Sequence, residues 1–323
     1  MPSRRRALLV LLSLTLLSVA SLVVALAAGS LVLSLGDVLS MLAGEDNTAR
    51  AVVFDLRLPR ALAAFACGGL LALAGALMQV LLRNPLADPY VLGISGGAGV
   101  GALSAMLLGL AGLAVPGFAF AGALAAMLLV FGLAHGDGSW TQTRLLLTGV
   151  VIAAGCGALV ALILTLAPEQ KIQSMLFWLM GDLSQAVNPL PALVVLVVTL
   201  LAALPFAREL NLLARGFDAA LALGVAVPLL RRVIYVIASL ATAVAVTTAG
   251  AIGFVGLIVP HLVRLAIGND QRLLLPASVL AGGSLLVCAD TLARTIVAPI
   301  QLPVGVLTAL IGVPVFLYLL GRR

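Results

Sequence analysis

The sequence predicts an all-α polytopic membrane protein with about ten transmembrane helices. Hydrophobic residues make up 63% of the 323 residues and charged residues only 9%, whereas a soluble domain carries about 25% charged residues. The mean hydropathy is +1.25. The apolar runs are continuous and lack the alternation of a membrane β-barrel. Because no stretch is long and polar enough to form a soluble domain, residues 1–323 are expected to form a single transmembrane domain.

Ten apolar runs follow one another along the chain, and each is expected to form one spanning helix. The first run could also be a cleaved signal peptide, because Ala25-Leu26-Ala27 resembles a cleavage site, but it is much longer than an h-region of about 7–15 residues. Residues 167–188 are expected to hold an interfacial re-entrant helix. The expected spans are 7–33, 58–80, 93–112, 117–134, 144–166, 189–206, 231–250, 252–268, 274–297 and 303–320.

The basic residues predict the orientation of the chain. With ten spans both termini lie on one side, and thirteen basic residues fall on that side against five on the other. Because Arg- and Lys-rich loops stay in the cytoplasm, both termini are expected there. The net charge of +6 is therefore a topology signal and not a nucleic-acid signal. The thirteen are Arg4, Arg5, Arg6, Arg83, Arg144, Arg208, Arg215, Arg231, Arg232, Arg264, Arg272, Arg322 and Arg323, and the five are Arg50, Arg57, Arg60, Lys171 and Arg294.

The stretch 207–232 differs from the rest because charges, glycines and a proline interrupt it. No window in it offers the roughly 20 apolar residues that a span needs. A short helix is expected from Phe217 to Leu223, since Asp218 would lie in its first turn and Gly224 would end it. Such a capped helix at the membrane surface is suited to contact another protein, and an ordinary loop is the alternative.

Nucleotide binding by this chain is not expected. The segment 97–102 fits G-x-G-x-x-A, but no strand precedes it and no acidic residue follows about 20 residues on, so close helix packing explains it better. The single lysine, Lys171, follows Gln170 and not a glycine, which excludes a G-x-x-x-x-G-K-[ST] phosphate-binding loop. Any ATP hydrolysis that drives the protein must therefore take place in another subunit.

Metal and nucleophile chemistry is not expected either. The two histidines are far apart, the three cysteines each stand alone in a span, and no C-x-x-C or H-E-x-x-H spacing occurs. The more informative charges are Asp290 and Arg294, which lie four residues apart and are expected to pair on one face of the ninth span. This pair could be structural or could take part in transport.

Several ordered segments resemble one family. They are Arg57-Leu58-Pro59-Arg60 and the stretches 75–79, 83–89, 92–99, 250–261 with Arg264, 289–294 and 302–305. In this order they are similar to the permease subunits of FecCD-type (type II) ABC importers for cobalamin, haem and ferric siderophores. The resemblance covers nearly the whole chain.

The resemblance implies partners and a coupling site. The expected assembly is a homodimer of ten-helix subunits with two cytoplasmic ATPase subunits and a periplasmic substrate-binding protein. The segment from Gly216 to Gly224 would contact the ATPase, with Ala220 and Leu221 facing it. Phe217 departs from the family, in which this position often carries a polar or acidic residue. The implied coupling residues are Arg215, Gly216, Phe217, Asp218, Ala219, Ala220, Leu221 and Gly224.

The resemblance also implies a docking surface for the binding protein. Arg57 and Arg60, three residues apart, would project to one side of a helix, and Arg294 would lie near the outer end of the ninth span. In the family, basic residues at these positions receive acidic residues of the binding protein. The alternative is that these arginines anchor span ends at the lipid headgroups.

The sequence thus predicts a permease subunit of an ATP-driven importer in the bacterial inner membrane. It would move an iron chelate (haem or a ferric siderophore) or cobalamin by alternating access at the dimer interface. The chain itself would bind no cofactor and no metal, and ATP with Mg²⁺ would bind in the partner ATPase. An ion-coupled secondary carrier is the alternative, although its signatures are weak here. A structural scaffold would not explain the exposed coupling segment.

Overall fold

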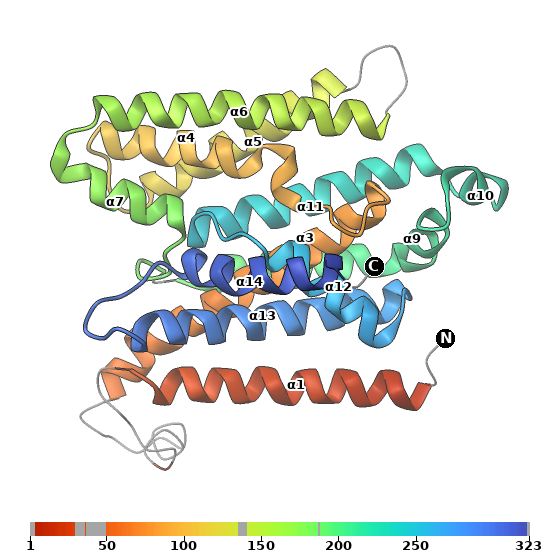
Figure 1. Cartoon of the computed structure of the whole chain (residues 1–323), viewed down its shortest axis with the longest axis horizontal. Helices are drawn as coiled ribbons and strands as arrows, with labels where there is room; N and C mark the ends of the chain where they lie inside the picture. The colour runs from red at the N-terminus through yellow and green to blue at the C-terminus, as the bar shows by residue number, and fades with distance from the viewer. Residues whose placement is uncertain (1–3, 30–35, 37–49, 135–140, 187, 322–323) are drawn as a thin grey trace.

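The computed structural model is a bundle of helices that run side by side along its long axis (Figure 1). It describes residues 4–29, 36, 50–134, 141–186 and 188–321, and these contain helices and connections without a strand. In order, the helices are α1 (Arg4–Ala27), η1 (Val52–Arg57), α3 (Leu58–Leu81), η2 (Pro89–Leu92), α4 (Ile94–Leu107), α5 (Ala114–Ala134), α6 (Gln142–Leu166), α7 (Glu169–Met180), α8 (Leu190–Ala203), η4 (Leu204–Phe206), α9 (Ala207–Leu213), α10 (Phe217–Ala222), α11 (Val227–Ala249), α12 (Val255–Ile267), α13 (Gln271–Thr295) and α14 (Val304–Gly321).

The helices confirm the predicted fold class. Among the described residues, seven helical segments are long and apolar enough to cross a membrane, and α4, α12 and α14 are shorter apolar helices. Together they match the ten predicted spans, although the end of the predicted first span lies outside the described residues. The helix predicted within 167–188 is α7, which connects α6 to α8 at one end of the bundle (Figure 1).

Helix α3 forms the centre of the bundle. It packs most extensively against α13 and α11, and 89% of the residues in the most apolar 18-residue stretch of Val52–Leu81 are buried. Small residues allow this, because a side chain at Gly75 would overlap the carbonyl oxygen of Gly256 in α12. The predicted packing role of 97–102 is confirmed in the same way, since side chains at Gly97 and Gly101 would overlap backbone carbonyls of α5.

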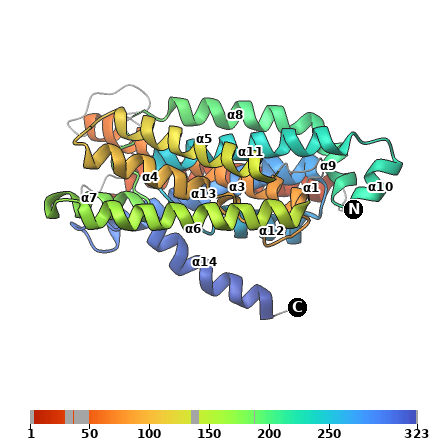
Figure 2. The ribbon, with the colours of Figure 1, turned by 90° about the horizontal axis from the view of Figure 1, so that it is seen from above.

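The outer helices expose apolar side chains, as lipid contact requires. Only 6% of the residues in the most apolar 18-residue stretch of α6 are buried. Helix α8 exposes Leu190, Val194, Val198 and Leu201. Helix α8 lies along one side of the bundle, and α6 and α14 lie on the opposite side, where α14 runs obliquely away from the other helices (Figure 2).

The two ends of the bundle carry different elements. Both ends of the described chain, α9 and α10 lie toward one end, which we call the α10 end (Figure 1). The opposite end, which we call the α7 end, carries η1, α7 and the connection between α13 and α14. Both candidate sites from the sequence fall at these ends.

Candidate functional site

Helix α10 (Phe217–Ala222) lies where the sequence predicted a short helix, and its C-terminal end is capped as predicted. Gly216 precedes it with a φ of 140°, and Asp218 lies in its first turn. At its end the N–H of Gly224 donates to Leu221 O at 2.9 Å, and the N–H of Val225 donates to Ala220 O at 3.0 Å. This is a Schellman motif, and it requires the left-handed conformation that Gly224 adopts with a φ of 80°.

The side chains that α10 exposes differ in one respect from the prediction. Asp218 and Ala219 are exposed, and Leu221 is 54% exposed, whereas Ala220 is fully buried within its own chain. The expectation that Ala220 faces a partner is therefore wrong, because this short helix directs the Ala220 side chain toward the bundle. Arg215, in the connection from α9, is exposed.

Phe217 connects α10 to two other elements. The guanidinium carbon of Arg231, in α11, lies 4.3 Å from the centre of the Phe217 ring. That of Arg83, which follows α3, lies 5.3 Å from it. Cations over an aromatic face are attracted by the negative potential of the ring. The sequence analysis included Phe217 among the coupling residues and noted its departure from the family, but it did not predict either contact.

Helix α9 is held to the beginning of α13. The side-chain amide of Asn211 donates to Asp270 Oδ1 at 2.9 Å, and its oxygen accepts from the N–H of Gln271 at 2.9 Å. Asp270 caps α13 and also accepts from the N–H of Arg272. Segments 59 and 60 residues apart are joined in this way, so no local pattern could have predicted the contact.

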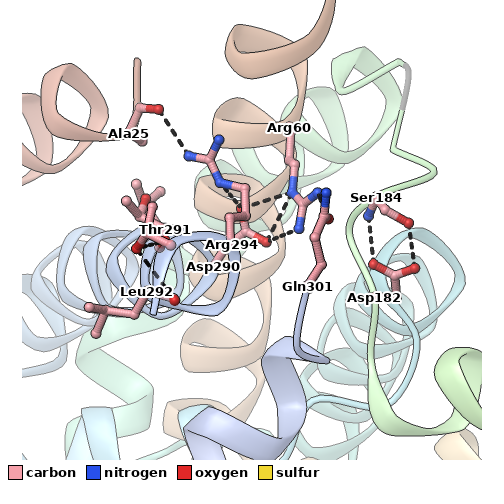
Figure 3. Close-up of polar contacts among 11 residues, drawn as sticks. Ala25, Arg60, Asp182, Ser184, Asp290, Thr291, Leu292, Arg294 and Gln301 are labelled. Carbon is pink, nitrogen blue, oxygen red and sulfur yellow. Dashed lines mark hydrogen bonds and ion pairs between the residues drawn. The ribbon is translucent and has the colours of Figure 1, made fainter. Parts of the chain in front are cut away.

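At the α7 end a buried carboxylate brings two arginines together (Figure 3). Arg60 donates from Nε to both oxygens of Asp290 at 3.1 and 3.0 Å, and from Nη2 to Oδ1 at 2.8 Å. The Nε of Arg294 lies 3.5 Å from Oδ2. The structure therefore contains the predicted Asp290–Arg294 pair, but Arg60 is the closer partner. Arg60 also donates from Nη1 to Gln301 at 2.9 Å.

Arg57 and Arg294 both reach the end of α1. Arg57 Nη1 donates to the carbonyls of Leu26 and Ala27 at 2.7 and 3.0 Å, and Arg294 Nη2 donates to Ala25 O at 2.9 Å. The last carbonyls of a helix lack intrahelical partners and carry partial negative charge, so these cations stabilise the end of α1.

The geometry alters the expected docking surface. Arg57 is only 5% exposed, and the side chains of Arg60 and Arg294 are 12% and 10% exposed. Arg57 turns to α1 and Arg60 to α13, so the two do not project to one exposed side as the sequence suggested. Lys171 behaves similarly, because its Nζ donates to the carbonyls of Met106 and Leu107 at the end of α4.

The cysteines and the remaining acidic residues form no cluster in the described part of the chain. Cys67, Cys156 and Cys288 are free thiols. Within the described ranges, no three His, Cys, Asp or Glu side chains lie close enough together to hold a metal ion.

The helical fold and the apolar outer helices define a multi-pass membrane protein. The FecCD transport family model matches residues 15–322, and the chain belongs to this family. It is 45% identical over 283 residues to the cobalamin import permease of Halobacterium salinarum, which covers 87% of this chain and 76% of that protein. It is 43% identical over 279 residues, 83% of each protein, to the hemin transport permease of Yersinia pestis.

A solved structure agrees with this assignment. The chain superposes with a TM-score of 0.83 and 32% identity on a protein described as a metal-chelate type ABC transporter in an inward-facing conformation. The match covers 98% of this chain and all of the other. Family membership therefore rests on sequence and on fold together.

Proposed function

We propose that this chain is the membrane-spanning subunit of an ATP-driven importer for an iron chelate or cobalamin in the bacterial inner membrane. The observation that carries the proposal is α10, a short helix that follows Gly216, ends in a Schellman motif and exposes Leu221 at the end of the bundle where both described chain ends lie. Relatives named for cobalamin and hemin support a large chelate as the cargo. Two copies of the chain would form the pathway by alternating access.

In this proposal the α10 end is cytoplasmic and contacts the ATPase. Arg215, Gly216, Phe217, Asp218, Ala219, Leu221 and Gly224 would form or shape the contact, and buried Ala220 would support it from within. The exposed apolar side chains of Leu221 and Leu223, 54% and 65% exposed, lie outside the apolar spans and are suited to a groove of a partner protein.

The α7 end would then receive the periplasmic binding protein. Since Arg57, Arg60 and Arg294 already hold carbonyls and Asp290, acidic residues of that protein would add to a preformed network and would not meet free cations. The three arginines of this cluster outnumber its one buried carboxylate, so the cluster carries a net positive charge that favours an acidic partner.

Affinity purification tests the ATPase contact. The tagged chain, expressed with the proteins encoded beside it, is expected to retain a subunit that hydrolyses ATP. Leu221→Glu should release that subunit, because it places a charge in an apolar contact. Leu113→Glu is the matched control, since Leu113 is 89% exposed and lies in the connection between α4 and α5, beyond the end of α4 that Lys171 of α7 contacts. Retention of the ATPase by Leu221→Glu, or its absence from the wild-type chain, would refute the coupling assignment.

A further inference from the structure

The end of α3 has an unusual residue in a strained position. Arg83 adopts a φ of 46°. The N–H of Arg83 donates to Val80 O and that of Asn84 donates to Gln79 O, both at 3.1 Å, which is the hydrogen-bond pattern of a Schellman motif. Glycine normally occupies this position because a side chain is unfavourable there, as Gly224 does in the same motif at the end of α10.

The contacts of the Arg83 side chain explain why an arginine, and not a glycine, occupies this strained position. Its guanidinium lies over the Phe217 ring, 5.3 Å from the centre. A Cβ atom at Gly216 would stand 3.9 Å from Arg83 Nη2, so the guanidinium also lies beside the point where α10 begins. Arg231 approaches the same ring to 4.3 Å. Two cations repel each other, and the aromatic ring attracts both.

We propose that Phe217, held by Arg83 and Arg231, is a positioning residue that makes α10 move as one body with α3 and α11. We call these residues the Arg83–Phe217–Arg231 clamp. The inference deepens the proposed function, because it matters for transport only if α10 contacts the ATPase. Movement imposed on α10 would pass to α11 directly and to α3 through Arg83.

The position of α3 extends the effect across the molecule. Helix α3 is the buried centre of the bundle, and its other end carries Arg60, which pairs with Asp290 of α13. A displacement of α3 would therefore reach the arginine network of the α7 end. The Asn211–Asp270 contact attaches α9 to α13 and provides a second, parallel connection.

Replacing the ring tests the clamp. Phe217→Leu keeps an apolar side chain but removes the aromatic face, whereas Phe217→Tyr keeps the face. The readout is the distribution of distances between spin labels at Ala219 in α10 and Val236 in α11, both exposed. It is recorded for the full chain with its co-purified ATPase, in a background without native cysteines, before and after vanadate trapping.

We expect one narrow distribution for the wild type and for Phe217→Tyr in both states. In Phe217→Leu the population of other α10 positions should rise about four- to twenty-five-fold, since each of the two cation–π contacts shifts such an equilibrium by about two- to fivefold and the two factors multiply. An unchanged narrow distribution in Phe217→Leu would overturn the inference. Failure of the wild-type chain to retain an ATPase would instead count against the proposed function.

Arg83→Gly separates the clamp from ordinary structural support. Glycine relieves the left-handed strain, so thermal stability should stay the same or rise. The population of other α10 positions should nevertheless rise about two- to fivefold, because one of the two contacts with the Phe217 ring is lost. Arg232→Ala removes an exposed charge next to Arg231 and controls for the loss of charge alone. A purely structural Arg83 would leave the distribution of Arg83→Gly narrow, and that result would refute the proposal.

Discussion

Replacing Asp290 by asparagine should destabilise the α7 end of the bundle substantially. The buried Asp290 carboxylate accepts three hydrogen bonds from Arg60 and lies 3.5 Å from Arg294 Nε. Asparagine has nearly the same shape but removes the negative charge and turns an N–H₂ group toward one of the guanidinium groups. Two largely buried cations would then lack their shared anion.

The structure sets the expected magnitude. Breaking a buried ion pair from one side costs about 3–5 kcal/mol. Arg60 keeps Gln301 and Arg294 keeps the Ala25 carbonyl, and both side chains retain slight exposure, so we expect the lower part of that range, about 3 kcal/mol. With about 2–4 °C per kcal/mol, the apparent melting temperature should fall by roughly 6–12 °C.

The assay is the loss of monodisperse protein in detergent with rising temperature, supported by reversible unfolding in sodium dodecyl sulfate to obtain a free energy. Asp182→Asn is the control, because Asp182 lies nearby at the same end and its carboxylate accepts hydrogen bonds from the N–H and the hydroxyl of Ser184 within a local turn (Figure 3). The control should change stability by less than about 1 kcal/mol.

A double-mutant cycle decides whether the effect belongs to the Arg60–Asp290 pair. Arg60→Gln combined with Asp290→Asn should be less destabilising than the sum of the single changes, with a coupling of about 1.5–3 kcal/mol for a charge-assisted pair. Additive single effects, or a melting temperature of Asp290→Asn within about 2 °C of the wild type, would refute the reasoning.

Three further predictions follow from the same structure. Single cysteines at Ala219 and Gln170, in a background without native cysteines, should be labelled from the cytoplasmic and periplasmic sides respectively, and labelling of both from one side would contradict the proposed orientation. Gly75→Ala should lower stability by about 3 kcal/mol or more, because the added methyl group overlaps the Gly256 carbonyl. Gly132→Ala is the control and should be nearly neutral, because a methyl group there has no neighbour within 4 Å. Equal melting temperatures for the two variants would count against the tight α3–α12 contact. Burial raises the pKa of Asp88, in the connection after α3, from 3.8 to about 6. The folded protein therefore binds this proton more tightly than the unfolded chain, and stability should fall as the pH rises from about 4 to about 6. Asp88→Asn should flatten that part of the pH profile of stability.

The sequence by itself determined the fold class and the ends of many elements. Continuous apolar runs can satisfy their backbone groups in lipid only as helices, so composition and run length predict the ten spanning helices. The short helix between Gly216 and Gly224 was predictable for a local reason: the left-handed conformation at its end is cheap only for glycine. The pairing of Asp290 with Arg294 was predictable because both lie on one helix, four residues apart.

Only the tertiary structure decided which partners the charged and aromatic side chains contact. Arg60 meets an acid 230 residues away, Arg57 and Arg294 stabilise the end of α1, and Ala220 turns inward although its neighbours are exposed. Arg83 and Arg231 converge on Phe217 because the ends of α3, α10 and α11 meet in space. Backbone preferences act over a few residues and are written in the local sequence. A guanidinium group, in contrast, binds whichever carboxylate, carbonyl or ring the packing of distant helices brings within reach.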